Sequence, residues 1–352
     1  MSAAERPDLP LGKKLAFSAA LVVLGLLALE GVARLVVPPP TTPIQEEHER
    51  LITVLGLPAL NDIMEFDPVL FWRLVPDLRE FRVAGKIREH DVDFTVTTHA
   101  SLRSPPASKA KKGFRVLALG DSCTFGVGVE DEETWPAQLS RLLRGGEVDA
   151  EVINAGVPGY TAFQGKRFLE TRGLALEPDL VLVAFGFNDI DAEMPFSDAE
   201  TARMLAMSRL EAALVRSRVA YGMKRLLDGA LHRAKPAGGR PRLTEQEFYD
   251  TLEGIRALCD RAGADMLVVA WPYEAQVKER APDFVHYQIP AARFCVEREV
   301  DGVNLVTAFL RAEGSLFIDH VHASAAGCRV AAEALLPWVK ARAARRGARK
   351  PS

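Results

Sequence analysis

The chain has 352 residues, of which 48% are hydrophobic and 26% charged; this ordinary globular composition excludes wholesale disorder. Its length suits one large domain with appendages, or two domains. The net charge of −3 gives no reason to expect a nucleic-acid partner. Four cysteines without CxxC spacing exclude a small disulfide scaffold and leave open one isolated bridge; we expect neither a metal site nor a cofactor.

The first strong pattern is an apolar run near the amino terminus. Residues 15–29 carry no charge, and the run reaches Val37, about the length that a bilayer core requires, if Glu30 and Arg34 are tolerated. These two residues are spaced i, i+4 and can pair on one helix face near the interface. We predict a transmembrane signal anchor over residues 13–37.

Lys13 and Lys14 precede this run and predict that residues 1–12 stay cytoplasmic while the rest is exported. We therefore expect a single-pass protein of the cytoplasmic (inner) membrane, with its main domain on the periplasmic or extracytoplasmic side. A cleaved signal peptide is the alternative. A buried helix of a soluble domain is less favoured, because an apolar run that is flanked by lysines and lies this close to a terminus usually targets a protein to a membrane.

Residues 38–112 are predicted to form a spacer and a small extension. The proline cluster over 38–43 favours an extended spacer with little ability to pack. Strand-like patterns over 71–75 and 94–98 indicate that the extension is partly β. We expect it to lean on the main domain.

A regular alternation of apolar runs and helical periodicity predicts the main domain over residues 113–342. The apolar runs are residues 114–119, 152–153, 180–185, 266–270 and 303–306. This pattern favours an α/β fold: a three-layer, flavodoxin-like parallel sheet of about five strands with helices on both faces. One helix has clear ends, with a capping box at Thr244 and Glu247 and a stop at Gly263.

Two segments depart from this alternation. Residues 191–243 show no strand pattern and are predicted to be a helical insertion. Because the insertion follows a strand that carries Asn188, it should project near the carboxyl edge of the sheet, where it serves as a lid or substrate wall, or only packs. From Lys340 to the end there are six Lys or Arg and no acid, which predicts a basic, solvated tail over residues 343–352.

Polar motifs fall at the ends of three predicted strands, and a fourth precedes an alanine-rich helix. In open α/β sheets, ligands bind beyond the carboxyl ends of the strands. The motifs are Gly120-Asp121-Ser122, Asn154-Ala155-Gly156, Gly186-Phe187-Asn188-Asp189 and Asp319-His320-Val321-His322.

The first and last motifs contain the residue types of a serine hydrolase. A serine hydroxyl becomes a good nucleophile when a histidine takes its proton, and a carboxylate orients that histidine. Ser122 and His322 are 200 positions apart, so only the fold can bring them together. His320 competes with His322 as the base, but it breaks the Asp-x-x-His spacing from Asp319.

These four motifs resemble those of the SGNH, or GDSL-type, serine hydrolase family, over roughly residues 114–339 without the insertion. The four residues that give the family its name match Ser122, Gly156, Asn188 and His322 in order. Gly-Asp-Ser alone is common, but four blocks in order are a specific match. The resemblance implies the SGNH hydrolase fold. Cys123 departs from it, because a bulkier apolar residue is frequent there.

The resemblance also implies a mechanism through an acyl-enzyme. Ser122 would attack an ester carbonyl, His322 would act as general base and then general acid, and Asp319 would orient His322. Water or another acceptor would then clear the acyl group.

An oxyanion hole is implied as well, because attack places negative charge on the carbonyl oxygen. Its donors would be the backbone N–H groups of Ser122 and Gly156 and the side-chain amide of Asn188. Three further residues are expected to support the site: Asp121, Gly186 and Asp189.

Three functions fit this reading. The first is an exported, membrane-anchored serine esterase that hydrolyses acyl or acetyl esters. The second is an O-acyltransferase or deacetylase that acts on cell-surface glycans with the same triad. The third is a non-catalytic glycan-binding or scaffold protein, which the intact Ser122, Asp319 and His322 disfavour. The expected partners are an ester-bearing small molecule, lipid or glycan, and the membrane; no pattern predicts the oligomeric state.

Overall fold

The computed structural model divides the chain into two compact units: Met1–Pro43 with Ala206–Ala237, and Ile44–Leu205 with Gly238–Ser352. The described residues are 10–37, 58–87, 90–108, 110–111, 113–145, 148–190, 197–205, 217–220, 222–223, 226, 240–280 and 287–349.

The smaller unit contains one long apolar helix, α1 (Leu11–Val36). Within its segment Gly12–Val36, a stretch of 18 residues has a mean hydropathy of 2.2 and none of that stretch is buried, so by length and composition the segment can cross a membrane or serve as a signal sequence. Arg34 Nε donates to Glu30 Oε1 at 3.0 Å, the predicted i, i+4 pair. Glu30 also accepts the Ser217 hydroxyl at 2.7 Å.

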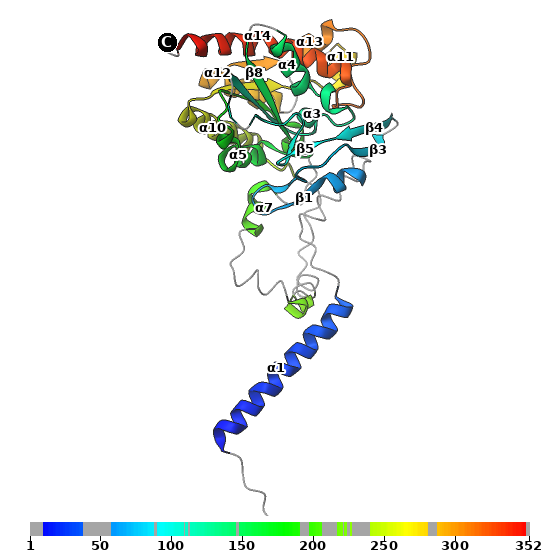
Figure 1. The fold of residues 1–352 in the computed structure, drawn as a ribbon, viewed down its shortest axis with the longest axis vertical. Helices are drawn as coiled ribbons and strands as arrows, with labels where there is room; N and C mark the ends of the chain where they lie inside the picture. The colour runs from blue at the N-terminus through cyan, green and yellow to red at the C-terminus, as the bar shows by residue number, and fades with distance from the viewer. Residues whose placement is uncertain are drawn as a thin grey trace, which may run out of the picture. The chain divides into compact units, whose positions relative to one another are not determined.

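The larger unit is an α/β domain around a central sheet (Figure 1). This sheet has seven strands in the order β11-β10-β9-β7-β8-β6-β5. Five neighbouring strands are parallel, which confirms the predicted fold class. They are β7 (Phe114–Gly120), β8 (Ala150–Gly156), β9 (Leu180–Ala184), β10 (Asp265–Ala270) and β11 (Gly302–Asn304). All seven residues of β7 are buried, as expected for a central strand covered on both faces.

Helices cover both faces of this sheet, each over its own buried apolar cluster. Figure 1 shows α5 and α10 on one side and α4 and α14 on the other. The helices of the first face are α5 (Ala162–Thr171), α10 (Glu245–Ala262) and α12 (Gln288–Arg298). Those of the second face are α4 (Trp135–Arg144), α13 (Val306–Arg311) and α14 (Ala325–Arg349).

Helix α10 begins and ends where the sequence predicts. The Thr244 hydroxyl accepts the backbone N–H of Glu247, whose carboxylate accepts the Thr244 N–H in return. Gly263 follows the last turn with a φ of 65°, a left-handed conformation that glycine adopts without strain. Strand β10 then starts two residues later.

The extension before the main domain is β-rich, and part of it joins the central sheet. A 3-10 helix, η1 (Pro58–Ile63), precedes two antiparallel hairpins. These are β1 (Met64–Asp67) with β2 (Phe71–Leu74), and β3 (Phe81–Ile87) with β4 (His90–Val96). The short strands β5 (Thr98–His99) and β6 (Leu102–Arg103) then continue the sheet beyond β8, where Arg103 pairs with Asn154.

Short helices complete the larger unit. They are α3 (Ser122–Phe125), η2 (Asp131–Glu133), η3 (Gly173–Leu176), α6 (Phe187–Ile190), α7 (Asp198–Leu205) and α11 (Glu274–Lys278). Helix α7 starts the predicted insertion, most of which lies outside the described residues, as does the proline cluster over 38–43.

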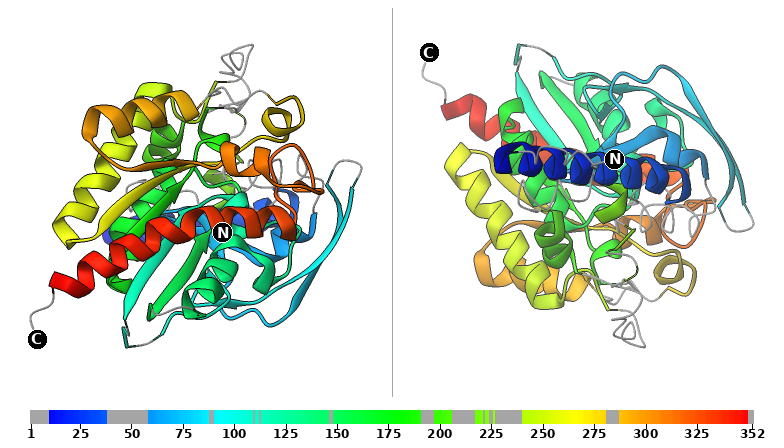
Figure 2. Two further views of the ribbon diagram at one scale, coloured as in Figure 1. Left: turned by 90° about the horizontal axis from the view of Figure 1, so that it is seen from above. Right: turned by 90° about the horizontal axis from the view of Figure 1, so that it is seen from below.

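The carboxyl-terminal stretch differs from the prediction of a solvated tail, because α14 continues through Arg349. Figure 2 shows this red helix running along the unit toward the end of the chain. Two of its basic residues have partners: Arg342 lies 2.5 Å from Asp301, and Arg346 donates to the carbonyl of Gly263 at 2.6 Å. These contacts explain why a run of positive charge folds as a helix here.

Candidate active site

Ser122 lies at the point where the central strand β7 turns directly into helix α3. Asp121 caps this helix, and its Oδ1 accepts the Cys123 N–H at 2.9 Å. The turn requires Gly120, because a Cβ there would lie 2.0 Å from Thr124 Oγ1. Ser122 is therefore held at the carboxyl end of the sheet by backbone packing.

The structure brings Ser122, His322 and Asp319 together. His322 Nε2 lies 2.9 Å from Ser122 Oγ, and His322 Nδ1 lies 2.8 Å from Asp319 Oδ2. The three residues are 4%, 2% and 4% exposed, so water does not weaken these contacts. With Nδ1–H directed at the carboxylate, the Nε2 lone pair faces the serine hydroxyl, which is the tautomer that a general base requires.

Asp319 is held in its ionised form. Its Oδ1 accepts the backbone N–H groups of Val321 at 2.9 Å and His322 at 2.7 Å. Burial opposes ionisation, but the hydrogen bond from the His322 ring, the attraction of that ring when it is protonated and these backbone bonds outweigh burial, so the pKa of Asp319 lies well below its usual value. A carboxylate is thus available to stabilise an imidazolium.

The loop that carries His322 is anchored to the core. Trp271 Nε1 donates to the carbonyl of Val321 at 2.8 Å, and Cys123 Sγ lies 3.6 Å from the same oxygen. The His320 ring instead packs against Phe187, with ring centroids 5.2 Å apart. The structure therefore places His322, and not His320, at Ser122; His286 lies outside the described residues.

Asn188 and Gly156 differ in what they can offer to a substrate. Asn188 Nδ2 donates to the carbonyl of Tyr160 at 3.0 Å and lies 3.4 Å from Asp121 Oδ2, so one of its hydrogens is only weakly engaged. The Gly156 N–H donates to Asn154 Oδ1 at 3.0 Å. A Cβ at Gly156 would also lie 2.2 Å from Phe125 N, so this glycine serves close packing of β8 against α3. The structure therefore does not match the predicted role of Gly156 as an oxyanion donor.

The expected supporting residues lie around this centre. Burial raises the pKa of Asp121 to about 6. Asp189 Oδ1 accepts the Ala162 N–H at 2.7 Å, at the start of α5, and burial raises the pKa of this carboxyl well above its usual value. Gly186 has a φ of 141°, and a Cβ there would lie 1.9 Å from the Tyr287 ring. Both the backbone and the packing therefore exclude a side chain at Gly186.

Sequence reasoning missed two side chains, Trp72 and Arg242, which together with Asn188 hold the loop over residues 157–161, between β8 and α5. Three successive carbonyl groups of this loop accept a buried side-chain donor. The contacts are Trp72 Nε1 to Pro158 O at 3.0 Å, Arg242 Nη1 to Gly159 O at 2.6 Å, and Asn188 Nδ2 to Tyr160 O at 3.0 Å. Trp72 and Arg242 lie 86 and 83 positions from their partners, so no local motif marks them.

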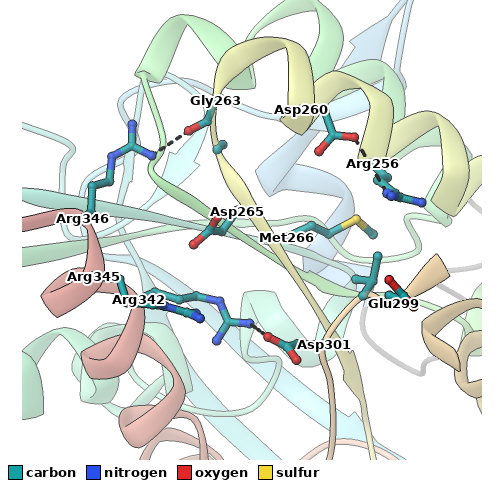
Figure 3. Close-up of a pocket in the computed structure, with 12 residues that line it drawn as sticks. Arg256, Asp260, Gly263, Asp265, Met266, Glu299, Asp301, Arg342, Arg345 and Arg346 are labelled. Carbon is teal, nitrogen blue, oxygen red and sulfur yellow. Dashed lines mark hydrogen bonds and ion pairs between the residues drawn. The ribbon is translucent and has the colours of Figure 1, made fainter. Parts of the chain in front are cut away.

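A separate pocket of about 640 Å³ lies at the other end of the sheet, where β10 begins (Figure 3). Its charged side chains are mixed in sign, with four arginines and four acidic residues, and it contains none of the predicted site residues. Within the described part of the chain, no group of three or more His, Cys, Asp or Glu side chains is arranged to hold a metal ion.

Comparisons with known proteins give matches over the same domain. A sequence profile described as the GDSL-like Lipase/Acylhydrolase family matches residues 118–330. An arylesterase of Vibrio mimicus is 36% identical over 83 residues, which are 24% of this chain and 40% of the arylesterase. The chain thus spans about two fifths of the length of this curated relative.

Solved structures give further matches at low identity. One is a lipolytic protein of the G-D-S-L family from Desulfitobacterium hafniense DCB-2, with 16% identity, a TM-score of 0.40, and coverage of 63% of this chain and 98% of that chain. Another is a variant of the acetylxylan esterase Axe2 from Geobacillus stearothermophilus, with 18% identity, a TM-score of 0.41, and coverage of 66% and 96%.

Proposed function

The chain belongs to the GDSL-like lipase/acylhydrolase family, and from this premise we propose that it is a serine ester hydrolase that works through an acyl-enzyme on Ser122. The observation that carries the proposal is the buried chain of hydrogen bonds from Asp319 through His322 to Ser122, at 2.8 and 2.9 Å. A nucleophile, a base and an orienting carboxylate in this order form the arrangement that activates a serine.

The reaction follows from this geometry. His322 Nε2 takes the Ser122 proton while Oγ bonds to the ester carbonyl carbon, and Asp319 stabilises the imidazolium that forms. The imidazolium then gives its proton to the departing alcohol oxygen as the C–O bond breaks, which leaves an acyl group on Ser122. Water enters, His322 takes one of its protons, and the resulting attack releases the carboxylic acid and restores the serine.

The oxyanion requires donors that are free to meet it. We assign the backbone N–H of Ser122 and the side-chain amide of Asn188 to this role, and leave out Gly156 because its N–H already has a partner. The third candidate is the backbone N–H of Gly159, because Gly159 lies one residue before Tyr160, whose carbonyl accepts the Asn188 amide. We include it as the third donor.

The test uses chromogenic acyl esters of increasing chain length, with aryl esters first because the curated relative is an arylesterase. We expect Ser122→Ala and His322→Ala each to lower kcat by at least about 10⁴-fold. Ser140 is a matched control, because it is equally buried but lies on α4, and Ser140→Ala should keep its activity. Equal turnover by the wild type and Ser122→Ala would disprove the serine mechanism.

The acceptor of the acyl group is a separate question. Our proposal is water, hence hydrolysis of acyl or acetyl esters. A cell-surface glycan as acceptor would make the protein an O-acyltransferase instead. Adding glycan acceptors to the assay distinguishes the two, because transfer yields an acylated sugar and hydrolysis yields free acid alone.

We propose that α1 anchors the protein in the cytoplasmic membrane with the larger unit on the exported side. Support comes from the fully exposed apolar surface of α1 and from Lys13 and Lys14 before it. A reporter enzyme that works only outside the cytoplasm, fused to the carboxyl terminus, should be active. Activity of a cytoplasm-only reporter at the same position would contradict this topology.

A further inference from the structure

A buried ion pair joins the two ends of the predicted insertion. Asp198 begins α7 and Arg242 precedes α10, and both are 2% exposed. Arg242 Nε lies 2.8 Å from Asp198 Oδ1, and the Asp198 N–H donates to the carbonyl of Arg242 at 3.2 Å. The two stems of the insertion therefore meet at this pair.

The pair also grips the loop over residues 157–161. Arg242 Nη1 donates to the carbonyl of Gly159, and Nη2 donates to Gln164 Oε1, both at 2.6 Å. Gln164 Oε1 in turn accepts the Thr161 N–H at 3.1 Å, and the Thr161 hydroxyl donates to Asp198 Oδ2. Gly159 in the middle of the loop is thus hydrogen-bonded to Arg242, and Thr161 at its end is hydrogen-bonded to Asp198.

The buried ion pair is not expected to contribute much to the free energy of unfolding. Removing two charges from water costs several kcal/mol per ion, and apolar replacements of such pairs are often neutral or stabilising. An arginine does offer several donors in a rigid plane, which fixes the direction of each acceptor. The pair is therefore suited to set geometry.

The ion pair of Arg242 and Asp198 fixes backbone groups that belong to the proposed oxyanion hole. A peptide unit is planar, so a donor that holds a carbonyl also fixes the N–H of the next residue. Trp72 holds the Pro158 carbonyl and thereby orients the Gly159 N–H, while Arg242 fixes the next plane through the Gly159 carbonyl. The Asn188 amide donates to the Tyr160 carbonyl and also lies 3.4 Å from Oδ2 of Asp121, the residue before Ser122.

We propose that Arg242 and Asp198 are positioning residues, which hold residues 157–161 so that the oxyanion donors meet the transition state. This inference rests on the proposed function and adds two residues from the insertion stems to it. The ion pair also connects the insertion to the site, because a movement of Asp198 or Arg242 would change the hydrogen bond from Arg242 to the Gly159 carbonyl.

Arg242→Lys is the first test, since lysine keeps the charge opposite Asp198 and loses the planar fork. We expect kcat to fall about 10- to 100-fold with KM nearly unchanged, because misplacement of donors affects the transition state more than substrate binding. The matched control is Arg342→Lys. Arg342 is 3% exposed and ion-paired with Asp301, but it lines the pocket at the amino end of the sheet (Figure 3). This control should keep the wild-type kcat.

A double variant separates positioning from folding. Arg242→Met with Asp198→Leu removes both charges together, so we expect a Tm close to that of the wild type. Its kcat should stay as low as that of Arg242→Lys. Recovery of both Tm and kcat in the double variant would overturn the proposal, because it would show that the pair acts only through stability.

Hydrogen exchange gives a readout that does not depend on turnover. Peptides covering residues 157–161 should exchange faster in Arg242→Lys than in the wild type and in Arg342→Lys. Wild-type kcat and wild-type exchange in Arg242→Lys, in an enzyme that Ser122→Ala inactivates, would overturn the inference and leave the proposed function standing. Absence of turnover and of fluorophosphonate labelling in the wild type would overturn both.

Discussion

The two ends of the central sheet treat buried carboxylates differently. At the amino end, Asp179 precedes β9, and its Oδ1 lies 2.6 Å from Lys111 Nζ and 2.7 Å from Arg346 Nε. At the carboxyl end, Asp121 is as buried as Asp179, but its hydrogen bonds come from the Cys123 backbone and the Asn188 amide, which are neutral. One carboxylate is paired with cations, and the other accepts hydrogen bonds from neutral groups.

This difference shows at which end of the sheet the fold keeps buried carboxylates without a cationic partner, although such burial costs free energy. At the amino end, Asp179 is paired with Lys111 and Arg346. In the pocket of Figure 3, Arg342 is paired with Asp301 and Arg256 with Asp260. The carboxyl end instead concentrates buried groups with displaced pKa values, namely Asp121, Asp189 and Asp319. Such concentrations are typical of functional sites.

The largest effect should come from replacing an aspartate by its neutral isostere at each end. Asp319→Asn should lower kcat about 10⁴-fold, because an amide favours the wrong histidine tautomer and cannot stabilise the imidazolium. Asp179→Asn should lower the free energy of unfolding and leave kcat of the folded enzyme unchanged. Steady-state kinetics below the Tm of both variants measures this contrast, and equal losses of kcat would remove the distinction between the two ends.

A smaller effect is expected from the amide that faces the site. Asn188→Ala should lower kcat about 10²- to 10³-fold with little change in KM, because it removes a donor that acts mainly in the transition state. Asn304→Ala is the matched control: Asn304 ends β11, three strands from β7, and its Oδ1 accepts the Val306 N–H at 3.0 Å. A larger change in KM than in kcat for Asn188→Ala would point to substrate binding instead.

The smallest effect concerns stability and pH. The pKa of Asp121 rises from 3.8 to about 6 on folding, so the folded state binds this proton more tightly. The stability that this group contributes is present below about pH 4 and is lost as pH rises through about 6, a decrease of about 1–3 kcal/mol. Asp121→Asn keeps an oxygen for the Cys123 N–H and removes the titration.

Denaturant unfolding at several pH values measures this effect. The difference in unfolding free energy between Asp121→Asn and the wild type should move in favour of the variant between pH 4 and pH 7. Parallel curves for the two proteins would show that Asp121 does not titrate in this range.

Much of the fold could be predicted from the sequence, because its signals are local. Buried parallel strands appear as continuous apolar runs, so five strand positions were correct, and the Thr244 capping box identified the start of α10. The motif with Ser122 follows a strand and the motif with His322 lies in a loop. In the structure, His322 Nε2 lies 2.9 Å from Ser122 Oγ.

The remainder depends on contacts that no local pattern encodes. A sequence motif does not reveal which backbone N–H groups already donate a hydrogen bond. The N–H of Gly156 donates to Asn154 Oδ1. The strands β5 and β6 have two residues each, too few for any periodicity. Arg242 follows a sequence that contains glycines and prolines, where a solvated charge would be ordinary. Its burial becomes visible only with Asp198 and Gly159 around it.

The long spans of these contacts bear on how the protein folds. Trp72 reaches Pro158 across 86 positions, Arg242 reaches Gly159 across 83, and His322 reaches Ser122 across 200. Contacts of such sequence separation form late, because the loops between them must close first. Ser122 therefore lacks its base until the chain has been made through His322 and has folded, so a growing chain that ends before His322 cannot hold the complete triad.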